Sequence, residues 1–178
     1  MDFVQTTAEF FQQRIDFVFL VYGLAFVLLS AVCLAVGKDK TQRLPWHWLG
    51  MFGLTHGINE WLEMLPISLG DSPAFAWVRL GVMSMSFFFL VEFSRLGWER
   101  LGLGAYGIRI HLPMAVFASI GLAIGPAALN ATVRYVLGFG GGLWAARVLW
   151  CAGKAEETNR RFLYAGALAT AAYAVAAG

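Results

Sequence analysis

Residues 17–37 read FVFLVYGLAFVLLSAVCLAVG, an apolar run without a single charged side chain. A helix needs about 20 mostly apolar residues to cross the hydrocarbon core of a bilayer. The rest of the chain is of the same kind, because 59% of its 178 residues are hydrophobic and only 13% are charged. A water-soluble domain of this size needs a larger polar surface. The sequence therefore predicts a protein that crosses a membrane several times.

Further apolar runs of similar length follow the first one. They lack the period-two alternation of barrel strands and are too long for such strands, so the predicted class is an all-α helical bundle forming one domain over residues 1–178. We expect six membrane helices, at about 17–37, 46–66, 75–96, 107–126, 131–151 and 162–178. Because the last run is still apolar at Gly178, we also expect a seventh helix and a cytoplasmic output domain in a longer parent protein.

The distribution of basic residues predicts the orientation. Cytoplasmic connections of membrane proteins are enriched in Lys and Arg. The connections and helix ends that follow the first, third and fifth predicted helices hold ten of the 13 basic residues: Lys38, Lys40, Arg43, Arg95, Arg100, Arg109, Arg147, Lys154, Arg160 and Arg161. We therefore expect this side in the cytoplasm and the N-terminus outside.

The second predicted helix contains the unusual stretch FGLTHGINEWLE at 52–63. His56, Glu60 and Glu63 are spaced i, i+4 and i+7, so they share one helix face, with Asn59 beside them. At a rise of about 1.5 Å per residue, His56 falls near the bilayer midplane and the two glutamates fall in the outer half. Ionisable groups at such depths usually face a bundle interior or a watery cavity, in pairs.

Three more charged residues are predicted at similar depths. Asp16 lies at the outer end of the first helix, and Arg79 and Arg134 lie about one turn inside the third and fifth helices. Because Arg pairs well with carboxylates, we expect Glu60 or Glu63 to pair with Arg79 or Arg134 as a two-state element. Three interpretations stay open: a pocket for a small ligand or ion, a set of ion pairs that fixes the helices, and a proton relay.

A metal or haem site is a weaker alternative. His56 and Glu60 could supply two ligands, but one histidine at that depth makes a poor zinc or copper site. His111 is predicted near the cytoplasmic end of the fourth helix, which argues against a bis-histidine haem. Cys33 and Cys151 form no CxxC motif and are predicted to be buried, inert thiols. We expect no cofactor, no enzyme active site in this chain and no nucleic-acid partner.

Two glycine patterns predict close helix packing. Gly53 and Gly57 form a GxxxG spacing beside the polar face of the second helix. The GFGGG stretch at 138–142 follows no strand and precedes no Lys-Ser/Thr pair, so it is no nucleotide-binding loop. Close packing or a local distortion of the fifth helix is expected there instead.

Four stretches, taken in order, carry a family resemblance: FLVYGLAFVLLSAVCLAV, LPWHWLGMFGLTHGINEWLEML, FFFLVEFSRLG and VRYVLGFGGGLWAARVLW. They resemble the N-terminal membrane module of bacterial sensor histidine kinases and diguanylate cyclases, over roughly residues 17–178. The resemblance implies a sensory input domain in the bacterial inner membrane, in a homodimeric parent protein that signals to a cytoplasmic response regulator. It assigns no catalytic residue and no known ligand to this region.

A more distant similarity is to the membrane domain of ethylene receptors. There, an Asp on the first helix and a Cys-x-x-x-His on the second are associated with copper. Asp16 and His56 match this pattern, but Phe52 stands at the cysteine position, so the soft ligand that Cu(I) prefers is missing.

A different functional class, a small transporter or a non-catalytic subunit of a membrane complex, also stays open. Transport requires a continuous polar route across the bilayer. The inner half of the predicted bundle offers few polar residues, namely Ser84, Ser86 and the Glu92–Arg95 pair, which argues against transport more than against an accessory subunit.

Overall fold

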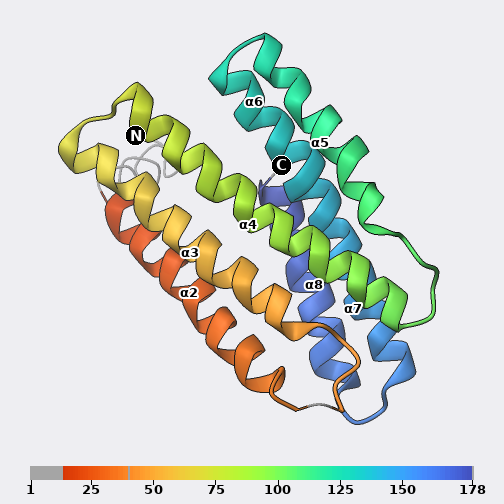
Figure 1. The fold of residues 1–178 in the computed structure, drawn as a ribbon. Coiled ribbons are helices and arrows are strands. Elements are labelled where there is room, and N and C mark those ends of the chain that lie inside the picture. Colours follow the sequence, from red (N-terminus) through yellow and green to blue (C-terminus); the bar gives the residue numbers. More distant parts are fainter. Residues whose placement is uncertain (1–13, 40, 178) are drawn as a thin grey trace, which may run out of the picture.

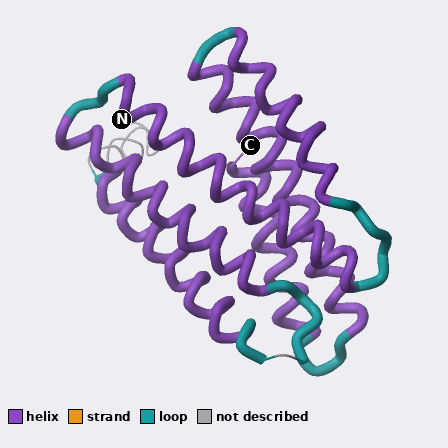
Figure 2. The backbone as a smooth tube through the Cα atoms, viewed as in Figure 1, coloured by secondary structure: helices purple, strands orange, loops and turns teal. Residues whose placement is uncertain are grey.

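The computed structural model describes residues 14–39 and 41–177, and within these ranges the chain is an all-α bundle without strands (Figures 1 and 2). The predicted all-α class is thus confirmed. In chain order the elements are α2 (Ile15–Val36), α3 (Trp46–Leu69), α4 (Pro73–Arg100), the 3-10 turn η1 (Ile108–Ile110), α5 (His111–Ser119), the 3-10 turn η2 (Ile120–Ala123), α6 (Pro126–Val133), the π-helical segment η3 (Arg134–Phe139), α7 (Gly140–Ala155) and α8 (Arg160–Ala177).

Three helical stretches of the described chain are long and apolar enough to cross a membrane: Ile15–Val36, Pro73–Arg100 and Pro126–Ala155. They correspond to the first, third and fifth predicted helices. Helices α3 and α8 occupy the positions of the second and sixth, but they do not reach the same combination of length and hydropathy. Along α2, large apolar side chains such as Phe17, Leu28 and Val32 are about 60% exposed, as expected of a surface that faces lipid.

The fourth predicted helix, at 107–126, is shorter in the structure, where the apolar helix covers Ile108–Ala123. Its end is set by Gly125, whose φ of 141° suits glycine, and by Pro126 at the first turn of α6. The two arms of this hairpin pack closely, because a Cβ atom at Gly121 would lie 2.4 Å from the carbonyl oxygen of Ala128.

Helix α4 passes through the centre of the bundle. Its Phe87, Leu90 and Phe93 side chains have no exposed surface. On one side α4 packs on α3, which in turn packs on α2, and on the other side it packs on α7, which packs on α8. The bundle therefore has an α2–α3 side and an α7–α8 side, with α4 between them (Figure 1).

Both glycine patterns lie at close helix contacts. A Cβ atom at Gly53 or at Gly57 would lie 2.7 Å from a backbone carbonyl oxygen of α2. In the second pattern, a Cβ at Gly138 would meet the Phe87 ring at 2.8 Å, and one at Gly142 would meet the Ala174 Cβ at 2.7 Å. The expected local distortion is present too, because the chain is π-helical over Arg134–Phe139.

Three connections, 37–45, 101–107 and 156–159, contain or are flanked by most of the basic residues, and we call them the basic connections. They lie toward the same end of the bundle, and the two others, 70–72 and 124–125, lie at the opposite end (Figure 2). Lys40, which was counted with the first of them, lies outside the described residues. This arrangement is the one that the distribution of basic residues predicts.

Candidate functional site

The polar residues of the FGLTHGINEWLE stretch lie in two separate groups. We call the inner group, formed around His56, the His56 cluster. His56 is only 4% exposed, and its ring lies between α4 and α8. Its Nδ1 is 3.0 Å from the Ser86 hydroxyl of α4, and its Nε2 is 2.9 Å from the Tyr173 hydroxyl of α8.

The hydrogen-bond partners of His56 fix its tautomer. Ser86 donates its single hydroxyl hydrogen to the Met83 carbonyl at 2.7 Å, so its oxygen accepts from Nδ1–H of His56. In the neutral ring Nε2 then carries no hydrogen and accepts from the Tyr173 hydroxyl. Glu60 Oε1 lies 3.4 Å from the same Nε2, but an unprotonated Nε2 has no hydrogen to offer it. His56 is thus a neutral link between α4 and α8, not half of an ion pair with Glu60.

An aromatic shell surrounds the His56 ring. The ring centroids of Phe26, Phe52, Phe87 and Tyr173 lie between 4.6 and 5.5 Å from that of His56. Phe52, which stands where the ethylene-receptor pattern has its cysteine, is therefore a packing partner of the histidine. The shell comes from four helices, and it keeps water away from the imidazole.

Asn59, Glu60 and Arg134 extend the His56 cluster. Asn59 is 1% exposed, and its Oδ1 accepts no hydrogen bond from the described residues. Arg134 donates from Nε to the Asn130 side chain at 2.9 Å, and it lies close enough for its charge to act on both His56 and Glu60. Three of the predicted site residues, His56, Asn59 and Glu60, are therefore buried together in the bundle, and the half-buried Arg134 lies near them.

The outer group is centred on Arg79 of α4, and we call it the Arg79 cluster. Arg79 bridges two carboxylates, with Nη1 2.6 Å from Glu63 and Nη2 2.6 Å from Asp71. Its guanidinium also lies 5.4 Å from the centre of the Phe75 ring. Asp71 was not singled out in the sequence, although it is the one carboxylate in the short connection between α3 and α4. This cluster closes the α3–α4 hairpin beside the 70–72 connection.

The remaining predicted site residue is Asp16. It lies in the first turn of α2 with an exposed side chain. In the described part of the chain it belongs to neither cluster.

A third polar group joins α4 to the start of α5 at the basic end of the bundle. Glu92 and Arg95 form two short contacts, at 2.5 and 2.9 Å, and Arg95 also donates to the Tyr106 carbonyl at 3.1 Å. His111 Nε2 lies 3.2 Å from Glu92, while its Nδ1 lies 2.9 Å from the Ile108 carbonyl. The Glu92–Arg95 pair was predicted from the i, i+3 spacing, but the contact between His111 and Glu92 was not predicted.

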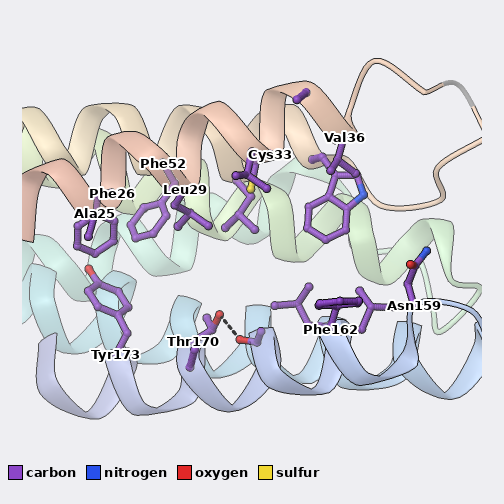
Figure 3. Close-up of a pocket in the computed structure, with 18 of the residues that line it drawn as sticks. Ala25, Phe26, Leu29, Cys33, Val36, Phe52, Asn159, Phe162, Thr170 and Tyr173 are labelled. Atoms are coloured by element: carbon purple, nitrogen blue, oxygen red, sulfur yellow. Dashed lines mark hydrogen bonds between the residues drawn. The ribbon is translucent and has the colours of Figure 1, made fainter.

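A large cavity lies between α2 and α8 (Figure 3). Its volume is about 990 Å³, and its wall is mostly apolar. None of the predicted site residues lines it, but Tyr173, the partner of His56, forms part of its wall. Tyr173 was not predicted as a site residue, because nothing in the alanine-rich sequence around it indicates that its hydroxyl contacts His56.

A metal ion finds no ready set of ligands in the described chain. Within that part, no group of three or more His, Cys, Asp or Glu side chains is placed to hold one. A metal bound at His56 would have to displace either Ser86 or Tyr173 from the ring nitrogens.

The chain matches no protein-family model, and it has no significant match among curated proteins or solved structures. The resemblance to sensor modules therefore stays a prediction from the four sequence stretches. The four stretches, the His56 and Arg79 clusters and the cavity are the features that bear on the function of the chain.

Proposed function

We propose that the chain is the sensory input module of a bacterial signal-transduction protein in the inner membrane, with six helices in the bilayer and the N-terminus outside. The apolar helices, the clustering of basic connections at one end and the four-stretch resemblance support this proposal. In the sensor modules that the four stretches resemble, the membrane helices precede a kinase or cyclase domain, and we propose that such a domain of the parent protein converts the signal into output. The parent protein acts as a homodimer and, as a kinase, passes phosphate to a response regulator.

The observation that carries the proposal is the hydrogen bond between His56 and Tyr173. Helix α8 packs along α7 and η3, whereas its Tyr173 ring reaches across to Phe26 of α2 and Phe52 of α3, at 5.5 and 5.7 Å between centroids. Tyr173 thus joins the two sides of the bundle at a buried polar contact. A shift of α3 relative to α4 moves His56, and His56 moves α8, which precedes the proposed output domain in the chain.

The Arg79 cluster is the entry point for the signal. The side chain of Asp71 is 47% exposed and that of Glu63 is 26% exposed, while Arg79 is mostly covered. A small ligand or ion from outside that competes for these charges loosens the contact between α3 and α4. Such a ligand shifts the equilibrium only by its difference in affinity for the two arrangements.

The test of this coupling is the Tyr173→Phe variant of the parent protein, assayed in membranes. The change removes only the hydroxyl that His56 Nε2 accepts from, so we expect basal autophosphorylation or cyclic diguanylate synthesis to change about fivefold, equivalent to one hydrogen bond of about 1 kcal/mol. Tyr164→Phe, on the same helix beside Trp150, is the matched control and should keep normal output. Equal output from both variants would remove the His56–Tyr173 link from the mechanism.

The membrane orientation is tested separately, with single cysteines in a background that lacks Cys33 and Cys151. We expect Ala74→Cys and Ala127→Cys to react with an impermeant maleimide in intact cells. Ala105→Cys and Glu157→Cys should react only after the membrane is permeabilised. Labelling of all four positions from outside, or a stop codon directly after Gly178, would contradict the proposal.

A further inference from the structure

We propose that the cavity between α2 and α8 binds one phospholipid of the cytoplasmic leaflet, with an amine in its head group. From the proposed function this inference takes the location and the orientation of the chain in the membrane. It assigns a second ligand, at a place separate from the Arg79 cluster.

The cavity has the length and lining that suit an acyl chain. It extends along α2 from Tyr22 to Val36, which is about 21 Å at the rise of an α-helix. Figure 3 shows α2 and α8 facing each other across it, with Leu29 and Phe162 directed into the gap. Its volume of about 990 Å³ is at the upper end of what ligand pockets offer, so it accepts a long chain and not merely a small molecule.

The middle of the cavity offers its occupant few hydrogen-bonding groups. Thr170, a polar residue in this part of the wall, donates its hydroxyl to the Gly166 carbonyl of its own helix at 2.7 Å. Toward the end of the cavity away from the basic connections, the Tyr173 ring rises from α8 toward Phe26 and narrows the cavity (Figure 3). Because the wall between these points is apolar, hydrocarbon is favoured over water there.

The opposite end is polar and acidic, which selects the head group. Asp39, Gln42, Glu156 and Asn159 line this end, where the basic connections place the cytoplasmic surface. Hydrogen bonds from the Thr41 backbone and hydroxyl lower the pKa of Asp39, so it is ionised at neutral pH. Two carboxylates suit a primary ammonium, and the side-chain amides beside them can donate to a phosphate. A head group that carries both charges, such as ethanolamine phosphate, therefore fits better than a purely anionic one.

A lipid in this cavity contacts Tyr173, the residue whose hydrogen bond to His56 joins the two sides of the bundle. The tip of the acyl chain meets Tyr173, whose hydroxyl bonds to His56. A bound lipid therefore supports the Tyr173 ring in the position in which it contacts His56.

The test uses the full-length protein in nanodiscs that contain a phospholipid with a photoreactive diazirine near the end of its chain. Ethanolamine, glycerol and choline head groups are compared at equal mole fraction, and the adducts are mapped by peptide mass spectrometry. We expect adducts on the α2 and α8 segments that line the cavity, about fivefold more abundant with the ethanolamine lipid.

Two matched pairs of variants separate specific binding from ordinary lipid contact. Ala169→Phe fills the cavity and should remove the adducts, whereas Val175→Phe, on the exposed face of α8 that does not line the cavity, should keep them. Asp39→Asn combined with Glu156→Gln should abolish the head-group preference, whereas Glu157→Gln, which is exposed outside the cavity, should not.

Three results would overturn the proposal. The first is equal adduct formation with all three head groups and in the Ala169→Phe variant, which indicates bulk lipid only. The second is a preference for the glycerol lipid. The third is capture of protein in place of lipid by benzoylphenylalanine at Val32, since a second copy or a later helix of the chain would then fill the cavity. Because these outcomes do not depend on kinase or cyclase output, they are separate from failure of the proposed sensory function.

Discussion

The contact between α2 and α3 depends on two glycines, and replacing Gly53 with alanine tests it most directly. A Cβ atom at this position would lie 2.7 Å from the Phe26 carbonyl oxygen and 3.1 Å from the Ser30 nitrogen, both backbone atoms that cannot rotate away. Ordinary contact begins at 3.4 Å, so α2 must withdraw by about 0.7 Å from α3. A gap of this size forfeits about a quarter to a half of each dispersion contact along the interface.

We therefore expect Gly53→Ala to lower the free energy of unfolding by about 1–3 kcal/mol, the usual cost of overpacking. Gly81→Ala in α4 is the matched control, because nothing lies within 4 Å of a Cβ at that position. There, the gain in helix propensity should leave stability unchanged or raise it by up to about 1 kcal/mol. The measurement is equilibrium unfolding in mixed detergent–SDS micelles, followed by tryptophan fluorescence. Equal stability of the two variants would refute the close backbone contact between α2 and α3.

Three further predictions concern charged residues. Glu92→Gln should lower the free energy of unfolding by about 3 kcal/mol, because it leaves the covered guanidinium of Arg95 without its carboxylate partner. Glu99→Gln is the control, because its carboxylate is half exposed and its loss should lower the free energy of unfolding by less than about 1 kcal/mol. Unfolding in detergent–SDS micelles measures both variants. Arg79→Ala should insert into the membrane normally but change the output of the parent protein, as measured by fractionation and an output assay. The hydrogen bond from the Thr41 backbone amide to the Asp39 carboxylate should persist as the pH falls from neutral and be lost only below the ordinary pKa of 3.8, because the Thr41 and Gln42 hydrogen bonds lower the pKa of the folded carboxyl. The chemical shift of the Thr41 amide proton, followed by NMR against pH, measures the loss of this hydrogen bond.

The helices were largely predictable because membrane-length apolar runs need no knowledge of their partners. The first helix was predicted at 17–37 and is found at Ile15–Val36. The fourth was predicted too long, because an apolar run continues through Gly125 and Pro126 and hides the reversal of the chain there. Hydrophobic content marks where helices occur, whereas a single glycine with positive φ decides where this one ends.

The candidate site was predictable along α3 but not across helices. Helical spacing alone placed His56, Asn59 and Glu60 on one face, and all three are buried together. The partner of His56 lies 117 residues away, and no local pattern connects the two positions. The cavity was beyond prediction for a related reason, since it depends on the separation of α2 and α8, which only the packing of the whole bundle determines.

The π-helical segment has a consequence for how this chain tolerates insertions and deletions. A π-helical turn holds one residue more than an α-helical turn, so the stretch Pro126–Ala155 carries a residue that a straight helix would not need. Because the wider turn absorbs that residue, deleting one residue within 134–139 would restore uniform α-helix and leave α6 and α7 nearly in phase with each other. A deletion elsewhere in α6 or α7 has no wider turn to absorb it, and would rotate the preceding part of the span by about 100°. The π-helical segment is therefore the place in this span where the chain best tolerates the loss of one residue.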